Sequence, residues 1–283
     1  MRLLFLLLFS LFISASAHAF TVGNFETPES VVVDPEDGSY YVSNINGSPT
    51  GKDANGYISK ISPDGTAVIQ RYIGNKPDEA PLHAPKGLAI IGKDIFVTDI
   101  DTVKGYDKAT GKLSVIVDMT KFEAKFLNDL ASDGQGILYV SDMMGNKIFR
   151  IDTNKNYEVT VFKAGEQLGN PNGLLVNPKS KNLMIVTWGS GRILEIDRQG
   201  RIHVLKRGLK GLDGMDLDGE GNLYVSSHGE GVIHRIAHFG RGKVSTAANG
   251  LNTPADISYD RAKDELLIPS FKGNTVSTLS GKK

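Results

Sequence analysis

Residues 212–226 read LDGMDLDGEGNLYVS. A short run of apolar and small residues, a turn rich in Asp and Gly, and a second apolar run follow one another, which is the pattern of two strands joined by a hairpin turn. Five other stretches repeat this frame. They begin at Pro28, Pro85, Leu127, Pro171 and Pro254, and their second strands are expected at 40–43, 95–98, 138–141, 184–187 and 266–269.

The repeat has a nearly constant length after its first copy. The second residue of each frame lies at 29, 86, 128, 172, 213 and 255, so the steps are 57, 42, 44, 41 and 42 residues. Units of about 40 to 45 residues with several short strands are typical of propeller blades. Third and fourth strands follow, as at 147–152 and 158–162. The sequence therefore predicts an all-β, six-bladed β-propeller, since a parallel β-helix would have shorter units.

Two irregularities of the repeat carry their own predictions. The long first step comes from residues 46–56, a Gly- and Pro-containing insertion that we expect to form a loop over one face. The last unit has a plausible third strand at 275–279, after which the chain ends. An open blade edge leaves unpaired backbone groups. We therefore expect residues 20–25 to supply the missing outer strand of blade six and close the ring.

The N-terminus has the layout of a secretory signal. Arg2 is followed by an apolar run over 3–13 and by the small-residue triplet Ala17-His18-Ala19. This predicts a signal peptide over residues 1–19, cleaved after Ala19, and a single propeller domain over 20–283. A membrane anchor is the competing interpretation, but the run is too short to span a bilayer. We expect an exported protein, either periplasmic or secreted.

Composition excludes several classes of partner. Lysine plus arginine and aspartate plus glutamate both number 32, so no nucleic-acid footprint and no membrane-attracting basic stretch is visible. The chain has no cysteine, which excludes disulfides, thiolate metal sites and a cysteine nucleophile. The expected partner is a small molecule, with no nucleic acid and no membrane span, and the expected state is a monomer.

The repeat register predicts a ring of side chains at the central axis. In a propeller the first strand of each blade runs beside the channel, so one residue per blade faces a shared axis. Two carboxylates and two carboxamides among these residues are hard oxygen donors that suit Ca²⁺ or another divalent cation. The alternative is a polar channel lining in which Lys86 offsets the acidic residues. The six positions are Glu29, Lys86, Asn128, Asn172, Asp213 and Ala255.

A second ring is expected just beyond the second strands. Its residues differ from one another, as the residues of a substrate pocket above an ion would, although ordinary loop variety would look the same. The predicted members are Asn44, Asp99, Asp142, Trp188, His228 and Phe271. From the two rings, we assign substrate binding to Lys86, Asp99, Asn128, Asp142, Trp188 and His228.

Four short motifs resemble the calcium-dependent lactonase family of regucalcin (senescence marker protein) and gluconolactonase. They are Glu29-Ser30-Val31, Asn128-Asp129, Asn172-Gly173-Leu174 and the run from Asp213 to Asp218. The resemblance implies that Glu29, Asn172 and Asp213 bind a calcium ion and that Asn128 lies beside both metal and substrate. The chain departs from members that bind sugar lactones, because Lys125-Phe126-Leu127 stands where those have an arginine.

The resemblance implies hydrolysis of lactones or related esters in the central channel. Asp213 would then serve as metal ligand and as general base. A metal-bound carboxylate is a weak base, so His228 is the alternative. From a different class of function, the chain would be a non-catalytic propeller that binds a ligand or protein, with a structural metal. The regular repeats and the absent arginine favour this second hypothesis.

Overall fold

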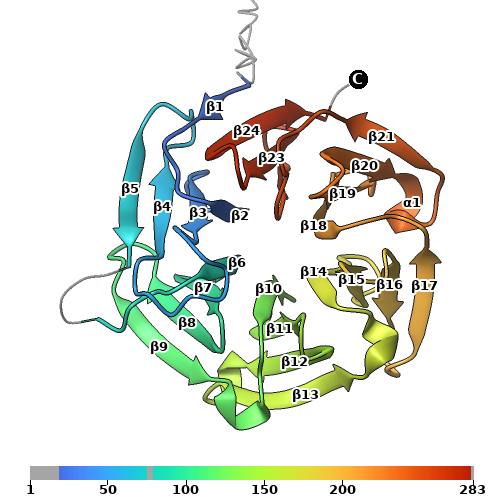
Figure 1. The fold of residues 1–283 in the computed structure, drawn as a ribbon, viewed down its shortest axis with the longest axis horizontal. Coiled ribbons are helices and arrows are strands. Elements are labelled where there is room, and N and C mark those ends of the chain that lie inside the picture. The colour runs from blue at the N-terminus through green and yellow to red at the C-terminus, as the bar shows by residue number, and fades with distance from the viewer. Residues whose placement is uncertain (1–18, 75–78, 282–283) are drawn as a thin grey trace, which may run out of the picture.

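The computed structural model describes residues 19–74 and 79–281, which form six four-stranded antiparallel sheets around a central axis (Figure 1). The predicted six-bladed propeller is confirmed. The predicted signal peptide lies outside the described residues except for Ala19. Blades one to three are β2 (Pro28–Val33), β3 (Tyr40–Asn44), β4 (Tyr57–Ile61), β5 (Val68–Ile73); β6 (Pro85–Ile91), β7 (Asp94–Asp99), β8 (Thr102–Asp107), β9 (Leu113–Asp118); and β10 (Leu127–Ser132), β11 (Ile137–Asp142), β12 (Lys147–Asp152), β13 (Glu158–Ala164).

The remaining blades follow the same order from the axis outward. They are β14 (Pro171–Val176), β15 (Leu183–Thr187), β16 (Ile193–Ile196), β17 (Ile202–Lys206); β18 (Leu212–Leu217), β19 (Leu223–Ser227), β20 (Val232–Ile236), β21 (Val244–Ala248); and β22 (Ser258–Asp260), β23 (Glu265–Ser270), β24 (Thr275–Ser280) with β1 (Thr21–Val22). The innermost strands β2, β6, β10, β14 and β18 surround the centre of Figure 1.

The ring closes with a strand from the N-terminus, as predicted. β1 is antiparallel to β24, with Thr21 opposite Ser277 and Val22 opposite Val276. The paired segment is shorter than the predicted 20–25, although the Phe20 carbonyl also accepts from the Thr278 amide. The first and last described strands thus share one blade, and the edge of β24 is paired over this stretch.

The core lies between neighbouring blades. One cluster joins Phe96 and Val103 of blade two to Val140 and Phe149 of blade three, all fully or almost fully buried. Such clusters form because the inner strands are rich in Val, Ile and Leu, and each sheet buries both faces against its neighbours. Burial of this apolar surface is the main term that holds the blades together.

The innermost strand of a blade, which we call its ring strand, begins with a β-bulge in blades one to five. In blade one Pro28 pairs with Asn44 and Val31 pairs with Val42. Between these two pairs the chain advances by three residues in β2 and by only two in β3. The same shift occurs between the first two strands of blades two to five. A bulge redirects the side chains that it contains. Here it contains the second residue of each repeat, the predicted axial position.

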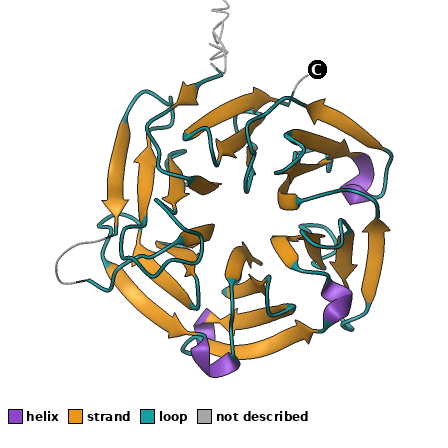
Figure 2. Cartoon of the chain, viewed as in Figure 1, coloured by secondary structure: helices purple, strands orange, loops and turns teal. Residues whose placement is uncertain are grey.

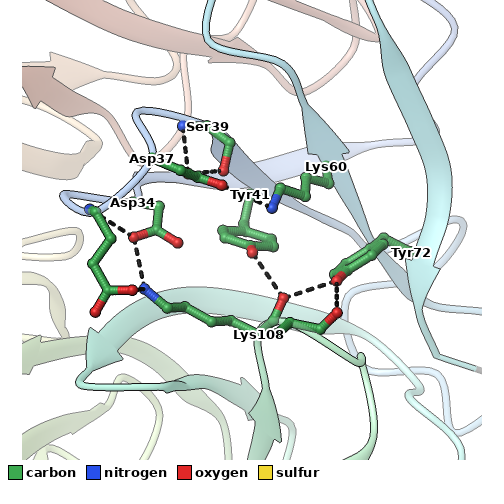
Figure 3. Close-up of polar contacts among 9 residues, drawn as sticks. Asp34, Asp37, Ser39, Tyr41, Lys60, Tyr72 and Lys108 are labelled. Carbon is green, nitrogen blue, oxygen red and sulfur yellow. Dashed lines mark hydrogen bonds and ion pairs between the residues drawn. The ribbon is translucent and has the colours of Figure 1, made fainter.

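Polar contacts tie adjacent blades together away from the axis. The Lys108 ammonium of blade two lies 2.8 Å from both Asp34 Oδ1 and Glu36 Oε2 of blade one. The backbone carbonyl of Lys108 accepts hydrogen bonds from the Tyr41 and Tyr72 hydroxyls (Figure 3). Because Asp34 and Lys108 are both buried, loss of one partner would leave an uncompensated charge.

The helical segments are short and lie away from the central channel (Figure 2). They are the 3₁₀ turns η1 (Thr120–Phe122), η2 (Thr153–Lys155) and η3 (Glu166–Leu168), and the single turn α1 (Ala237–Gly240). In the part of the chain described, no helix is both long and apolar enough to cross a bilayer. The predicted insertion at 46–56 is a loop without strand structure.

Candidate functional site

A pocket of about 250 Å³ lies at the end of the central channel where the ring strands begin. Its base, which we call the floor, consists of five of the six predicted axial residues: Glu29, Lys86, Asn128, Asn172 and Asp213. The structure therefore brings together all four predicted metal ligands. The sixth axial residue, Ala255, is fully buried and does not line the pocket.

Serine side chains fix the bulges that carry the floor residues. The Ser43 hydroxyl accepts from the Ser30 amide at 3.0 Å, and the Ser226 hydroxyl accepts from the Gly214 amide at 2.8 Å. Ser141 does the same for the Asp129 amide. Each bond satisfies a buried N–H that the bulge removes from the strand ladder. The residue before each of these amides is thereby held facing the pocket.

Two oxygen atoms of the floor are buried and have no hydrogen-bond partner in the described chain: Glu29 Oε2 and Asn172 Oδ1. The Asn172 amide nitrogen donates to Asp213 Oδ1 at 3.1 Å and to the Leu212 carbonyl at 3.2 Å. These bonds fix the carboxamide so that only its oxygen remains available. Buried polar atoms are rarely left without a partner, and such atoms mark a place for an ion or ligand.

The floor contains buried acidic and basic side chains, and their surroundings shift their pKa values. Burial raises the pKa of Glu29 well above its usual range, and repulsion from Asp213 adds to the rise, although Lys86 acts against it. Burial also lowers the pKa of Lys86 to about 8, against attraction from Glu29 and Asp99. The Lys86 ammonium donates to the Ala84 carbonyl at 2.8 Å and lies 4.5 Å from the centre of the Phe126 ring.

The floor fits a hard divalent cation. Glu29 and Asp213 offer carboxylate oxygens and Asn128 and Asn172 offer carboxamide oxygens, the donor types that Ca²⁺ and Mg²⁺ prefer. Two of these residues hold the partnerless oxygens described above. Within residues 19–74 and 79–281, no group of three or more His, Cys, Asp and Glu side chains is placed to bind a metal, so the candidate set depends on its carboxamides.

His228 stands beside this floor. Its Nδ1 atom lies 3.1 Å from Asp213 Oδ2, at ion-pair distance but without hydrogen-bond alignment. The imidazole is flanked by the Trp188 ring, 5.6 Å away between centroids, and by the Phe271 ring, 5.2 Å away. Both members of the predicted catalytic pair thus lie in one pocket and in contact with each other.

The strand register corrects the second predicted ring, which combines two different positions. Asn44, Asp99 and Asp142 pair with the first residue of their ring strands, whereas Trp188, His228 and Phe271 come one residue after that position. A slip of one residue turns a side chain to the other side of a strand. The true equivalents of the three later residues are Ile45, Ile100 and Met143.

Asp99 and Asp142, which we predicted to bind substrate, lie outside the pocket. Asp142 accepts from the amides of Lys125, Phe126 and Gly145 at 2.9 to 3.1 Å. Asp99 accepts from two amides just before β6 and forms a buried ion pair of 2.6 Å with Lys104. These carboxylates fix the segment that leads into the ring strand of their own blade, and Asn44 likewise accepts from the Glu26 amide.

The side walls of the pocket include residues that sequence reasoning missed. We call the wall the set Ile45, Met143, Trp188, His228 and Phe271, which occupy one repeated position and line the pocket. Phe126 and Pro49 complete the lining, from the segment before β10 and from the insertion. Alignment on Ser43, Ser141 and Ser226, which hold the bulges, would have placed Ile45 and Met143 level with His228.

A larger cavity of about 610 Å³ opens at the other end of the channel. Its acidic residues include Asp129 and Asp256, and each is bonded to a neighbouring blade: Asp129 accepts from the Leu174 amide at 2.6 Å, and Asp256 accepts from the Ser30 hydroxyl at 2.6 Å. Burial raises the pKa of Asp129 to about 7. We assign the functional site to the smaller pocket, where the partnerless oxygens lie.

Comparison with known proteins agrees with this architecture. The family described as SMP-30/Gluconolactonase/LRE-like region matches residues 27–254. No curated protein sequence matches at a significant level. Among solved structures, virginiamycin B lyase from Staphylococcus aureus superposes with a TM-score of 0.66 at 14% identity over 93% of this chain and 99% of that one.

Two further solved structures have the same fold. A protein of unknown function from Bacteroides thetaiotaomicron gives a TM-score of 0.68 at 16% identity, covering 93% of this chain and 72% of the other. A chain of a nidogen/laminin complex gives 0.61 at 22% identity, covering 75% and 76%. At these identities the likeness concerns the fold alone.

Proposed function

This chain belongs to the SMP-30/gluconolactonase/LRE-like family, and from that premise we propose that it is a calcium-dependent hydrolase of lactones or related esters. One observation carries the proposal. Two partnerless buried oxygens, Glu29 Oε2 and Asn172 Oδ1, lie in the same pocket as an aspartate–histidine pair. Metal-assisted ester hydrolysis needs a bound cation that polarises the carbonyl and a nearby base that accepts a proton from water.

The residues that would hold the cation are Glu29, Asn128, Asn172 and Asp213. When bound, a divalent cation would polarise the substrate carbonyl and stabilise negative charge on its oxygen. The carboxylates of Glu29 and Asp213, which are both buried and repel each other, would gain a counter-charge there. Lys86 has ammonium hydrogens beyond the one that it donates to Ala84, and we assign these to the carbonyl of the substrate and the carboxylate of the product.

His228 is the better placed of the two candidate bases. Asp213 Oδ2 lies 3.1 Å from His228 Nδ1 without hydrogen-bond alignment, and its negative charge would favour the imidazole tautomer that carries its proton on Nδ1, which leaves Nε2 to accept. Nε2 would take a proton from water as the water oxygen adds to the carbonyl carbon. The carbon–oxygen bond of the ester then breaks, and the same proton passes to the leaving oxygen.

The test is hydrolysis of a δ-lactone and an aryl ester with added calcium, with a chelator, and in the Asp213→Ala variant. We expect turnover that the chelator abolishes and that Asp213→Ala lowers at least about 100-fold. Asp218→Asn, in the hairpin turn of the same blade, is the matched control and should retain activity. If calcium binds and neither substrate is turned over, the enzyme proposal fails and the binding propeller is favoured. Unchanged calcium affinity in Asp213→Ala would contradict the floor assignment.

Ring opening by elimination is a second candidate. It is favoured by the likeness in fold to virginiamycin B lyase, of which one structure, with quinupristin, is described as a catalytically inactive histidine-to-alanine variant. In this chain His228 would then take a proton from carbon instead of from water, and the carbon–oxygen bond would break to leave an alkene and a carboxylic acid. Product mass separates the two reactions, because hydrolysis adds one water and elimination adds none.

A further inference from the structure

The polar and apolar groups of the pocket are sharply divided. All its charged and carboxamide side chains belong to the floor, and His228 is the one ionisable member of the wall. The remaining lining side chains are aliphatic or aromatic. They are Ile45, Pro49, Phe126, Met143, Trp188 and Phe271. A ligand whose carbonyl meets the floor would therefore place its other end against apolar surface.

Part of the donor capacity of the floor is already used within the protein. The side-chain nitrogen of Asn172 donates two hydrogen bonds to protein acceptors, and the Lys86 ammonium donates to the Ala84 carbonyl. The Asn128 amide nitrogen lies 4.0 Å from Met143 Sδ, the weakest of these contacts. What remains is enough for a cation and one ester group. Among the apolar residues of the lining, the Trp188 indole N–H is the one side-chain donor.

The mouth of the pocket has an exposed aromatic surface. Trp188 is 39% exposed and is the one exposed large apolar side chain that borders the pocket, as the described exposed set otherwise comprises Ile69, Ile116, Met144 and Val161. The rings of Trp188, His228 and Phe271 lie in a row, with centroid separations of 5.6 Å between the first two and 5.2 Å between the last two. Such a strip buries an alkyl or aryl group well, and its indole and imidazole nitrogens are too few to bond several hydroxyls.

We propose that this pocket takes lactones or esters whose non-reacting part is one small apolar alkyl or aryl group, and that it discriminates against polyhydroxylated sugar lactones. This specificity rests on the proposed hydrolase function. The volume of about 250 Å³ suits a ring with a short substituent. Each methylene buried against the wall contributes about fourfold in affinity. Each sugar hydroxyl left without a partner costs about fivefold or more.

The kinetic test compares δ-valerolactone, δ-octanolactone and glucono-δ-lactone. The propyl group of δ-octanolactone should raise kcat/KM about 50-fold over δ-valerolactone, and the sugar lactone should be the poorest by at least about tenfold. Phe271→Ala should lower the preference for the propyl group about fivefold. Ile69→Ala, an exposed apolar residue on the outer strand of blade one, is the control and should leave it unchanged.

A binding test separates this specificity from catalysis. Trp188 is the only tryptophan of the chain, so its fluorescence reports ligand entry without turnover. The corresponding δ-lactams, which are not readily hydrolysed, serve as probes in the wild-type, Phe271→Ala and Ile69→Ala proteins. Tighter binding of the propyl lactam than of the sugar lactam supports the specificity even if no lactone is turned over, in which case the hydrolase function alone fails. Equal or tighter binding of the sugar lactam, or a preference that Phe271→Ala does not reduce, overturns it.

Discussion

The floor and the wall of the pocket differ in how they are built. Floor residues such as Glu29 and Asp213 stand in bulges at the start of the ring strands, where serine hydroxyls hold the backbone. Wall residues such as Met143 and Trp188 directly follow the last residues of the second strands. The floor is polar and almost fully buried, whereas the wall is mostly apolar and partly exposed.

This difference separates two tasks within one repeat. Because the ring-strand bulge recurs in successive blades, it can bring several polar oxygens together at the axis, which suits a cation. The side chain just after the second strand differs in size from blade to blade and lies near the mouth of the pocket, which suits ligand selection. His228 is the exception, since it belongs to the wall by position and to the floor by its contact with Asp213. The largest expected effect follows from this exception.

Replacing His228 with glutamine should lower kcat about 1,000-fold on lactone substrates, because a positioned general base typically contributes that much. Calcium affinity, measured by titration calorimetry, should be retained. The chain provides a matched control in His203, whose Nε2 lies 2.9 Å from Asp197 on an outer strand far from the axis. His203→Gln should leave kcat unchanged. A His228→Gln protein with wild-type kcat would return the role of base to Asp213.

Replacing Asp142 with alanine should destabilise the protein by about 3 kcal/mol, because three backbone amides lose their acceptor. Urea denaturation measures this free energy. The neighbouring change Met143→Ala removes a wall side chain instead, so it should mainly raise KM for apolar lactones. If the two variants had the same effect on stability and on KM, the assignment of Asp142 to backbone support and of Met143 to the pocket would be wrong.

The sequence predicted the floor but missed two of the five wall residues, Ile45 and Met143, for a physical reason. The ring strands open with similar frames, so counting from Pro28 or Pro171 places each axial residue correctly. The second strands end less uniformly, because the place of Asn44 is taken by Thr187 in blade four and by Ser227 in blade five. Aligning Thr187 with Ser43 shifts the register by one residue, which exchanges a backbone-holding side chain for a pocket-lining one.

Other lining residues carry no repeat signal at all. Phe126 precedes its ring strand, and Pro49 belongs to the insertion of blade one, which has no counterpart in the other blades. Their position depends on three-dimensional contacts, such as the bond from the Phe126 amide to Asp142. Closure by the N-terminal strand, in contrast, could be predicted, since an unpaired blade edge has a definite energetic cost.

On the floor, Glu29→Gln should weaken calcium binding about 100-fold, because it removes one of two carboxylates while keeping the shape of the side chain. Titration calorimetry on the purified protein measures the change directly. Glu36→Gln is the control, since Glu36 is exposed and pairs with Lys108 away from the pocket. Equal calcium affinity in the two variants would show that the cation binds somewhere other than the floor.

The smallest expected effect concerns the insertion that carries Pro49. An ion pair of 2.5 Å between Lys52 Nζ and Asp101 Oδ2 ties this loop to blade two, but the Lys52 side chain is 53% exposed. Such pairs contribute about 0.2 to 1 kcal/mol and are screened by salt.

Lys52→Ala should therefore raise KM about twofold at low ionic strength, and the difference from wild type should vanish at high salt, because salt already screens the pair in the wild-type protein. The effect stays small because the Ala54 backbone amide donates to His83 Nδ1 and Asn46 Nδ2 donates to the Asn55 carbonyl, which keep the loop in place. Lys93→Ala, which removes an exposed pair with Asp107, is the control. A rise in KM of tenfold or more would instead show that the insertion controls entry to the pocket.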